Sequence, residues 1–119
     1  MNYHIVFIPL NPDHLDWTQD VMQQIQSLSP QLKLFLDSNF DAKIAEKIRH
    51  YSGVKLVIIG QKEIEHNCVS LRNFNLNDLI NVDHGDRFPW PCSVNDFIKI
   101  VSNQFRHLIR EDRINSILN

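Results

Sequence analysis

The buried-looking run Lys55–Gly60 and the short segment after it limit the fold of this chain most strongly. The run holds four consecutive aliphatic residues and ends in glycine, which is typical of a strand buried on both faces of a sheet. The next alternating segment, Asn67–Arg72, begins after only a short polar turn, Gln61–His66. Because so short a connection cannot make a parallel crossover, Asn67–Arg72 is expected to return antiparallel to the buried strand.

Strand and helix patterns alternate upstream of this run. Tyr3–Pro9 and Leu32–Leu36 are compact apolar runs that predict two further strands. His14–Leu28 carries its apolar residues on one helical face, and Asp13 is the expected N-cap. Asp41–Tyr51 predicts a second, shorter helix. The order β-α-β-α-β with short helices implies parallel strands joined by right-handed crossovers.

The second helix is expected to turn its apolar side chains toward the sheet and its basic ones toward solvent. The inward set is Ile44, Ala45 and Ile48, and the outward set is Lys43, Lys47 and Arg49.

After Arg72 the chain predicts a long irregular excursion over residues 73–92, with a short edge strand near Leu79–Val82. Ser93 is then the expected N-cap of a last helix whose apolar stripe extends over Phe97–Leu108. The resulting prediction is one domain over residues 1–119. It is a three-layer α/β/α fold with a mixed sheet of four or five strands, in which β-α-β-α-β is followed by an antiparallel strand and a C-terminal helix.

Composition excludes several classes of protein. The chain has 119 residues, 43% of them hydrophobic and 22% charged, and no apolar run approaches the roughly 18 residues that a membrane span needs. Its N-terminus lacks the features of a secretory signal, and its two cysteines are unpatterned, so a cytoplasmic protein with reduced thiols is expected. The formal charge of −2 argues against a general binder of polyanions.

Motifs for cofactors, metals and nucleophiles are missing. No glycine precedes Gly53, so neither a dinucleotide-binding turn nor a P-loop is present. The densest group of metal-ligand residue types is Asp83–Asp86, with His66 and Cys68 as distant additions, and it lacks the spacing of a metal site. Cys68 also has no orienting third group beside His66. No catalytic residue, metal or cofactor is therefore predicted.

The polar turn offers two interpretations. Lys62 and Glu63 lie on it, Arg72 ends the returning strand, and Phe74 comes two residues later. One interpretation is a solvated turn with a cross-strand Glu–Arg ion pair worth at most about 1 kcal/mol. The other is contact with unpaired bases: a carboxylate accepts the two hydrogen bonds of a guanine edge, an arginine donates to base carbonyls, and an aromatic ring stacks.

Three segments of the chain resemble a known family. They are HIVFIPLNPDHLDWTQDVMQQI (residues 4–25), AKIAEKIRH (42–50) and GQKEIEHNCVSLR (60–72). They are similar to the opening strand and helix, the second helix and the strand–turn–strand of the C-terminal anticodon-binding domain of class II aminoacyl-tRNA synthetases. The last segment resembles the threonyl enzymes most, since these characteristically show Gly-Asp-Lys-Glu-x-Glu followed by Val-x-x-Arg.

The resemblance implies recognition of a tRNA anticodon loop. The residues that match Glu63 and Arg72 contact the guanine and uracil that threonine anticodons share, and so does an asparagine whose place is taken here by Asp41. If this chain binds tRNA, Phe74 is expected to stack on a base, Lys62 to adjoin the site, and Lys43, Lys47 and Arg49 to position phosphates.

The resemblance also implies a partner. No class II catalytic motif is present, so a catalytic synthetase domain, in cis or in trans, is expected to complete an ATP-dependent threonine–tRNA ligase. A free-standing paralogue that serves as a protein-interaction or accessory subunit is the alternative, favoured by the acidic pI and the apolar stretch Phe88–Trp90. A small α/β enzyme is a third candidate, supported by the fold alone.

Overall fold

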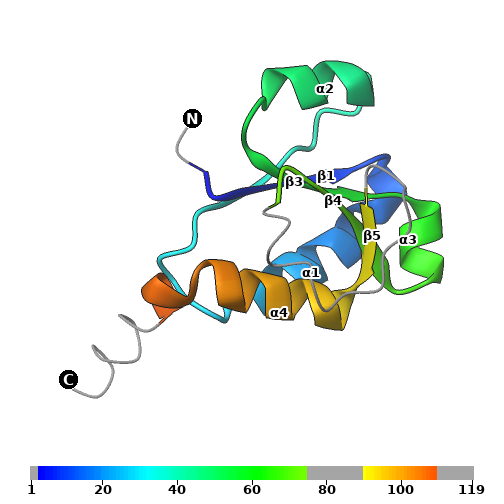
Figure 1. Cartoon of the computed structure of the whole chain (residues 1–119). Helices are drawn as coiled ribbons and strands as arrows, with labels where there is room; N and C mark the ends of the chain where they lie inside the picture. Colours follow the sequence, from blue (N-terminus) through cyan, green and yellow to red (C-terminus); the bar gives the residue numbers. More distant parts are fainter. Residues whose placement is uncertain (1–2, 75–89, 110–119) are drawn as a thin grey trace.

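A computed structural model describes residues 3–74 and 90–109 of the chain. Within them the structure is a five-stranded mixed sheet with helices on both faces (Figure 1). The elements are β1 (Ile5–Pro9), the 3₁₀ turn η1 (Pro12–His14), α1 (Leu15–Gln26), β2 (Leu34–Leu36), α2 (Ile44–His50), β3 (Lys55–Ile59), α3 (Gln61–Glu65), β4 (Cys68–Arg72), β5 (Trp90–Ser93) and α4 (Val94–Gln104).

The strands lie in the order β2-β1-β3-β4-β5. β1 pairs in parallel with both β2 and β3, as the β-α-β-α-β pattern predicts. β4 returns antiparallel to β3, with Leu56 opposite Arg72 and Ile58 opposite Ser70. β5 then pairs antiparallel with the outer side of β4. The predicted fold class is confirmed, with five strands among the described residues.

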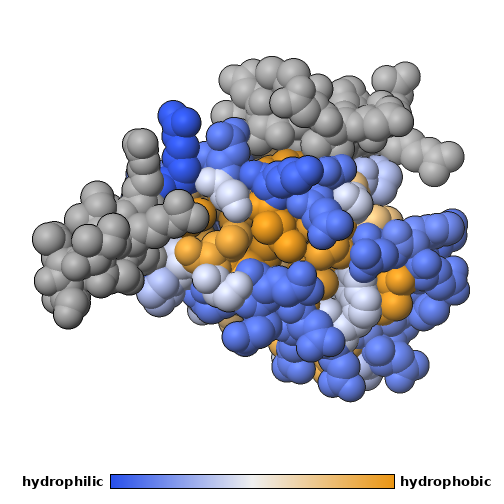
Figure 2. Space-filling view, turned by 90° about the horizontal axis from the view of Figure 1, so that it is seen from below, coloured by the Kyte–Doolittle hydropathy of each residue, from blue (hydrophilic) through white to orange (hydrophobic). Residues whose placement is uncertain are grey.

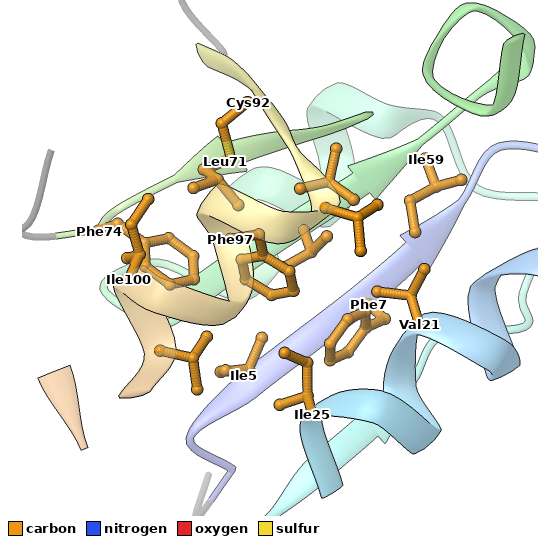
Figure 3. Packing of buried hydrophobic residues seen from close by; sticks show 14 of the residues in the cluster. Ile5, Phe7, Val21, Ile25, Ile59, Leu71, Phe74, Cys92, Phe97 and Ile100 are labelled. Atoms are coloured by element: carbon orange, nitrogen blue, oxygen red, sulfur yellow. The ribbon is translucent and has the colours of Figure 1, made fainter. Parts of the chain in front are cut away.

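The two helices α1 and α4 cover one face of the sheet and build the larger core (Figure 1). Phe7 of β1 lies against Phe97 of α4, with ring centroids 6.1 Å apart in an edge-to-face arrangement (Figure 3). Val21 and Ile25 of α1 are buried beside them. The four-and-three spacing of apolar residues along α1 and α4 therefore faces the sheet as the sequence predicts.

The helix α2 lies on the opposite face, above the sheet in Figure 1. A smaller core forms there, because alternate residues of β1 and β3 point to that side and meet Tyr51 at the end of α2. Its strand members are Val6, Ile8, Leu56 and Ile58. No residue of β4 belongs to this small core. Ser70 and Arg72, the β4 residues that point to the α2 side, therefore lie next to the core and outside it.

Several local predictions are corrected. The stretch Gln61–Glu65 forms the short helix α3 where a polar turn was expected. Asp13 is not an N-cap, because it lies inside the 3₁₀ turn η1, which Asn11 caps by accepting the Asp13 amide on Oδ1 at 2.8 Å. The N-cap residue of α1 is His14, whose side chain makes no cap hydrogen bond. Ser93 caps α4 as predicted, since its Oγ accepts the amide of Asp96 at 3.1 Å.

The excursion after Arg72 ends in a strand that sequence patterning missed. β5 contains Pro91, a residue found in sheets chiefly on edge strands, and β5 is the outermost strand beside β4. The edge strand expected near Leu79–Val82 lies outside the described residues. Within the described ranges, no helix has the length and apolarity needed to cross a membrane.

Candidate functional site

Three polar residues line up on the α2 side of β4. Ser70 and Arg72 are two positions apart on β4, so they point to the same face with their Cα atoms about 7 Å apart. α3 places Glu63 beside them, and the Ser70 hydroxyl donates a hydrogen bond of 2.9 Å to Glu63 Oε1. Glu63 and Arg72 are both half-buried. We call Glu63, Ser70 and Arg72 the β4 row.

Glu63 has a hydrogen-bond partner on the neighbouring strand. Its Oε1 accepts from the Ser70 hydroxyl of β4. One carboxylate oxygen is occupied by the hydroxyl, and the other, Oε2, lies close to Gly60. Glu63 on α3 and Arg72 on β4 are thus both next to Ser70, Glu63 through a hydrogen bond and Arg72 two positions along the strand.

The loop before α2 lies on the same side of the sheet as the β4 row. Asp41 and Lys43 are both exposed, and Lys43 is the N-cap residue of α2. The Asp41 amide donates to Asn39 Oδ1 at 3.1 Å, which shapes the loop into consecutive turns. Arg49 is exposed on α2 and Lys62 is exposed on α3, as predicted. These four side chains face solvent and are available to a ligand.

Lys47 is placed differently from the prediction. It is buried, and its ammonium forms an ion pair of 3.1 Å with Asp37, the residue directly after β2. The Tyr51 hydroxyl donates to the other carboxylate oxygen of Asp37 at 2.7 Å. Ile44, expected to face inward, is instead 36% exposed. Lys47 is therefore a structural link between α2 and the end of β2, and its expected outward position is wrong.

The contacts of this link shift the pKa values of Asp37 and Tyr51 in opposite directions. Burial alone would raise the pKa of Asp37, but hydrogen bonds from Tyr51 and Asn39 and the charge of Lys47 outweigh it. The pKa of Asp37 is therefore lowered below its ordinary value. Burial and the neighbouring carboxylate both raise the pKa of Tyr51, which keeps its phenol protonated as a donor. Asp37, Lys47 and Tyr51 therefore form a charged triad in which Lys47 and Tyr51 each bind one carboxylate oxygen of Asp37.

Phe74 also differs from the prediction. Its ring is only 8% exposed and packs edge-to-face on Phe97, with centroids 6.0 Å apart (Figure 3). It therefore belongs to the core under α4, on the face opposite the β4 row. A base can stack on Phe74 only if that core opens, so the burial of the ring speaks against the predicted stacking role.

The cysteines are poor nucleophiles. Burial, with smaller contributions from Asp96 and Cys68, raises the pKa of Cys92 to about 12. Burial and the charge of Glu63 raise the pKa of Cys68. Cys68 pairs with Ser93 and Cys92 with Val69, so the two thiols point to opposite faces of the sheet. Within the described residues no cluster of metal-ligand side chains is present, and Asp83–Asp86 lies outside them.

Sequence patterning missed two residues of the site. Ser70 has no binding motif of its own, and only its spacing of two from Arg72 signals a shared face. Gly60 is the second: a Cβ there would lie 2.8 Å from Leu10 Cδ1 and 3.3 Å from Glu63 Oε2. The absence of a side chain at Gly60 is what leaves room for the carboxylate of Glu63.

A cavity of about 410 Å³ lies beside α2. Its lining includes Asp37, Lys47, Tyr51, Phe35 and His50.

Comparison with known proteins identifies similar structures. No protein-family model and no curated protein matches the chain. The RNA-binding domain of threonyl-tRNA synthetase from Cryptosporidium parvum Iowa II is similar, with a TM-score of 0.63 and 16% identity over 85% of this chain. Histidyl-tRNA synthetase from Nostoc sp. PCC 7120 is also similar, with a TM-score of 0.65 and 14% identity over 87% of this chain.

The match is partial for the other proteins, because this chain covers 23% of each of them. At 14–16% identity the likeness concerns the fold. It agrees with the resemblance that the sequence motifs predict. The chain therefore adopts the mixed α/β fold of the RNA-binding domain of this threonyl-tRNA synthetase and of the matched part of this histidyl-tRNA synthetase.

Proposed function

We propose that this chain binds the anticodon loop of a tRNA, as an anticodon-binding domain of the threonyl type without chemistry of its own. The β4 row carries the proposal. Its carboxylate is fixed by Ser70 and its arginine lies about two strand positions further along the same face. An ionised carboxylate accepts from the N–H groups of a guanine edge, and a guanidinium fork donates to a base carbonyl.

Other exposed polar groups lie on α2, on the loop before it and on α3. Asp41, Lys43, Arg49 and Lys62 are exposed, and the loop before α2 opens on the same side of the sheet. We propose that Asp41 borders the second base and that the three basic side chains position phosphates. The parent activity would be ATP-dependent ligation of threonine to tRNA in the cytoplasm, with the catalytic domain supplied in cis or in trans.

The test uses anticodon stem–loop RNAs that differ only in the second and third anticodon positions. Fluorescence anisotropy gives the affinity of the chain for a guanine–uracil anticodon and for one with both bases exchanged. Glu63→Ala is expected to weaken binding of the guanine–uracil stem–loop by about tenfold and to reduce discrimination, since one base contact is worth roughly 1–3 kcal/mol. Arg72→Ala is expected to weaken binding and reduce discrimination by a similar factor, through the neighbouring base.

Matched controls are available in the same elements. Glu65 is an exposed carboxylate on α3, so Glu65→Ala removes the same charge without touching the β4 row. Arg72→Lys keeps the charge but loses the planar fork, so it should restore general affinity without restoring discrimination. If Glu63→Ala and Glu65→Ala bind both stem–loops equally well, the assignment of Glu63 fails.

A second candidate function, a protein-interaction or accessory subunit, has one observation in its favour. Figure 2 shows hydrophobic surface in the middle of the face formed by α1 and α4. The partly buried apolar side chains of this side are Trp17, Met22, Leu28, Ile98 and Leu108. Failure to bind any tRNA at low salt would favour this candidate, because electrostatic RNA binding is strongest there.

A further inference from the structure

The chain bends away from the sheet directly after Arg72. Arg72 is the final residue of β4 and lies opposite Leu56 of β3. The next residue, Asn73, has a φ of 67°, in the left-handed region that residues other than glycine rarely adopt. Asparagine is among the few side chains that tolerate this conformation. Asn73 therefore makes the bend that ends β4.

The side chain of Asn73 reaches back to the neighbouring strand. Its Nδ2 donates a hydrogen bond of 2.8 Å to the carbonyl oxygen of Val54, the residue directly before β3. The last pair between the two strands is that of Leu56 and Arg72. The Asn73 amide thus continues the connection between the strands beyond their last pair. Because strand ends open most easily, a bond at this place holds the end of β4 that carries Arg72.

The acceptor of this bond is itself fixed. The amide of Val54 donates to the carbonyl oxygen of Tyr51 at 2.9 Å, which closes the turn between α2 and β3. The side chain of Val54 packs against the small core on the α2 side, to which Tyr51 belongs. Asn73 therefore ties the end of β4 to a part of the molecule that is held by both its backbone and its side chains.

Asn73 also separates two residues that face opposite sides of the sheet. Arg72 points to the α2 side, whereas Phe74 is buried against Phe97 in the core under α4. The chain passes from one side to the other at Asn73. If the bond to Val54 were lost, the backbone at Arg72 would lose a support on the side where it leaves the sheet.

We propose that Asn73 is a positioning residue for Arg72, and that its amide fixes the strand end from which the guanidinium reaches a base. The inference rests on the proposed function, because it takes Arg72 as a group that contacts RNA. A guanidinium fork selects a base carbonyl only within a narrow range of distances and angles. Loss of the Asn73 amide should therefore reduce discrimination at the base that Arg72 contacts.

Two variants remove the donor at residue 73 in different ways. Asn73→Gly adopts the left-handed backbone without strain and has no amide. Asn73→Asp keeps the size of the side chain and tolerates this backbone, but a carboxylate cannot donate to the Val54 carbonyl. The bond is exposed, so both variants are expected to fold, and thermal unfolding checks this. Ser27→Ala is the control, because it removes an exposed hydrogen bond of 2.7 Å to Gln24 on α1.

Discrimination at a single base needs a third stem–loop, in which cytosine replaces only the uracil of the guanine–uracil anticodon. This exchange replaces a carbonyl that a guanidinium can bind with an amino group. Both Asn73 variants are expected to lower the preference for uracil about threefold, and Ser27→Ala should leave it unchanged. In an Arg72→Ala background the Asn73 variants should change the preference no further, because a residue that acts through Arg72 is coupled to it.

A second measurement needs no RNA. NMR relaxation gives the order parameter of the Arg72 backbone N–H, which reports its motion on the picosecond-to-nanosecond timescale. The order parameter should fall in both Asn73 variants and stay unchanged in Ser27→Ala.

This inference and the proposed function fail in different ways. If the unaltered protein prefers uracil and the Asn73 variants keep that preference, or lower it equally in the Arg72→Ala background, the positioning role is overturned and the proposed function stands. A loss in only one of the two variants would come from its charge or its backbone freedom, and would overturn the positioning role as well.

If the unaltered protein shows no preference but the order parameter of Arg72 falls in both variants, base recognition fails and the positioning of Arg72 stands. If there is neither a preference nor a change in the order parameter, both proposals are overturned.

Discussion

At the scale of single residues, the hydroxyl of Ser70 sets the direction of Glu63. It occupies Oε1 and leaves Oε2 close to Gly60, so the carboxylate has one fixed orientation before any ligand arrives. Such preorganisation reduces the conformational entropy that binding must offset. The motif of the chain identifies Glu63 and Arg72, but the spacing of two between Ser70 and Arg72 becomes informative only once their strand is known.

Gly60→Ala tests this orientation. A Cβ at Gly60 would come within 2.8 Å of Leu10 Cδ1 and 3.3 Å of Glu63 Oε2. Leu10 is 47% exposed and its methyl group can move, so the free energy of unfolding should change by no more than about 1 kcal/mol. Preference for the guanine–uracil stem–loop should fall about fivefold, because the carboxylate is displaced.

The measurement is anisotropy with both stem–loops, beside urea unfolding of the same protein. Gly53→Ala is not a suitable control, since Gly53 has a φ of +80° that alanine adopts only with strain. Ser52→Ala, an exposed position in the same turn, serves instead. Unchanged discrimination in Gly60→Ala would show that Glu63 does not depend on this space.

At the scale of elements, α2 shows what periodicity leaves undetermined. Its pattern predicts Ile44 inward and Lys47 outward, and the structure has Lys47 buried and Ile44 exposed. A helix of seven residues carries too few apolar positions to fix which face meets the sheet. The deciding partner is Asp37, which lies just after β2 and compensates the buried charge from outside the helix.

Lys47→Ala and Arg49→Ala are predicted to differ sharply, although the sequence suggests equal roles. Lys47→Ala leaves the buried carboxylate of Asp37 without its cation and should lower the free energy of unfolding by about 3 kcal/mol. Arg49 is exposed, so Arg49→Ala should change it by less than about 0.5 kcal/mol. Urea unfolding of the two variants at pH 7 measures the difference, and equal stabilities would contradict the buried ion pair.

At the scale of the whole molecule, stability depends on attaching the α2 layer to the sheet. Two helices and a large core secure one face, whereas the other relies on a small core and the triad of Asp37, Lys47 and Tyr51. Because the pKa of Asp37 is lowered in the folded chain, the unfolded chain binds more protons below pH 4. Asp37 therefore contributes stability that is complete above its ordinary pKa of 3.8 and is lost as the pH falls below it.

The predicted outcome is a steeper acid loss in the unaltered protein than in Asp37→Asn. The free energy of unfolding, measured by urea titration at pH 7, 5, 4 and 3, should fall more for the unaltered protein between pH 5 and 3. Asp37→Asn starts from a lower value, because Lys47 is left unpaired, but its curve should be flatter. Parallel curves would show that Asp37 does not contribute to acid unfolding.

The sequence by itself determined the order of elements, the parallel pairing of the first three strands and the antiparallel return of β4. These features result from local periodicity and from connections too short for other geometry. It also singled out Glu63 and Arg72 as candidate base contacts, through a motif within one segment, and that assignment stays a prediction. Only the tertiary structure decided that Phe74 and Lys47 are buried and that Ser70 bonds to Glu63. Each of those depends on partners distant in sequence, and burial of a charge or a ring is settled by those partners.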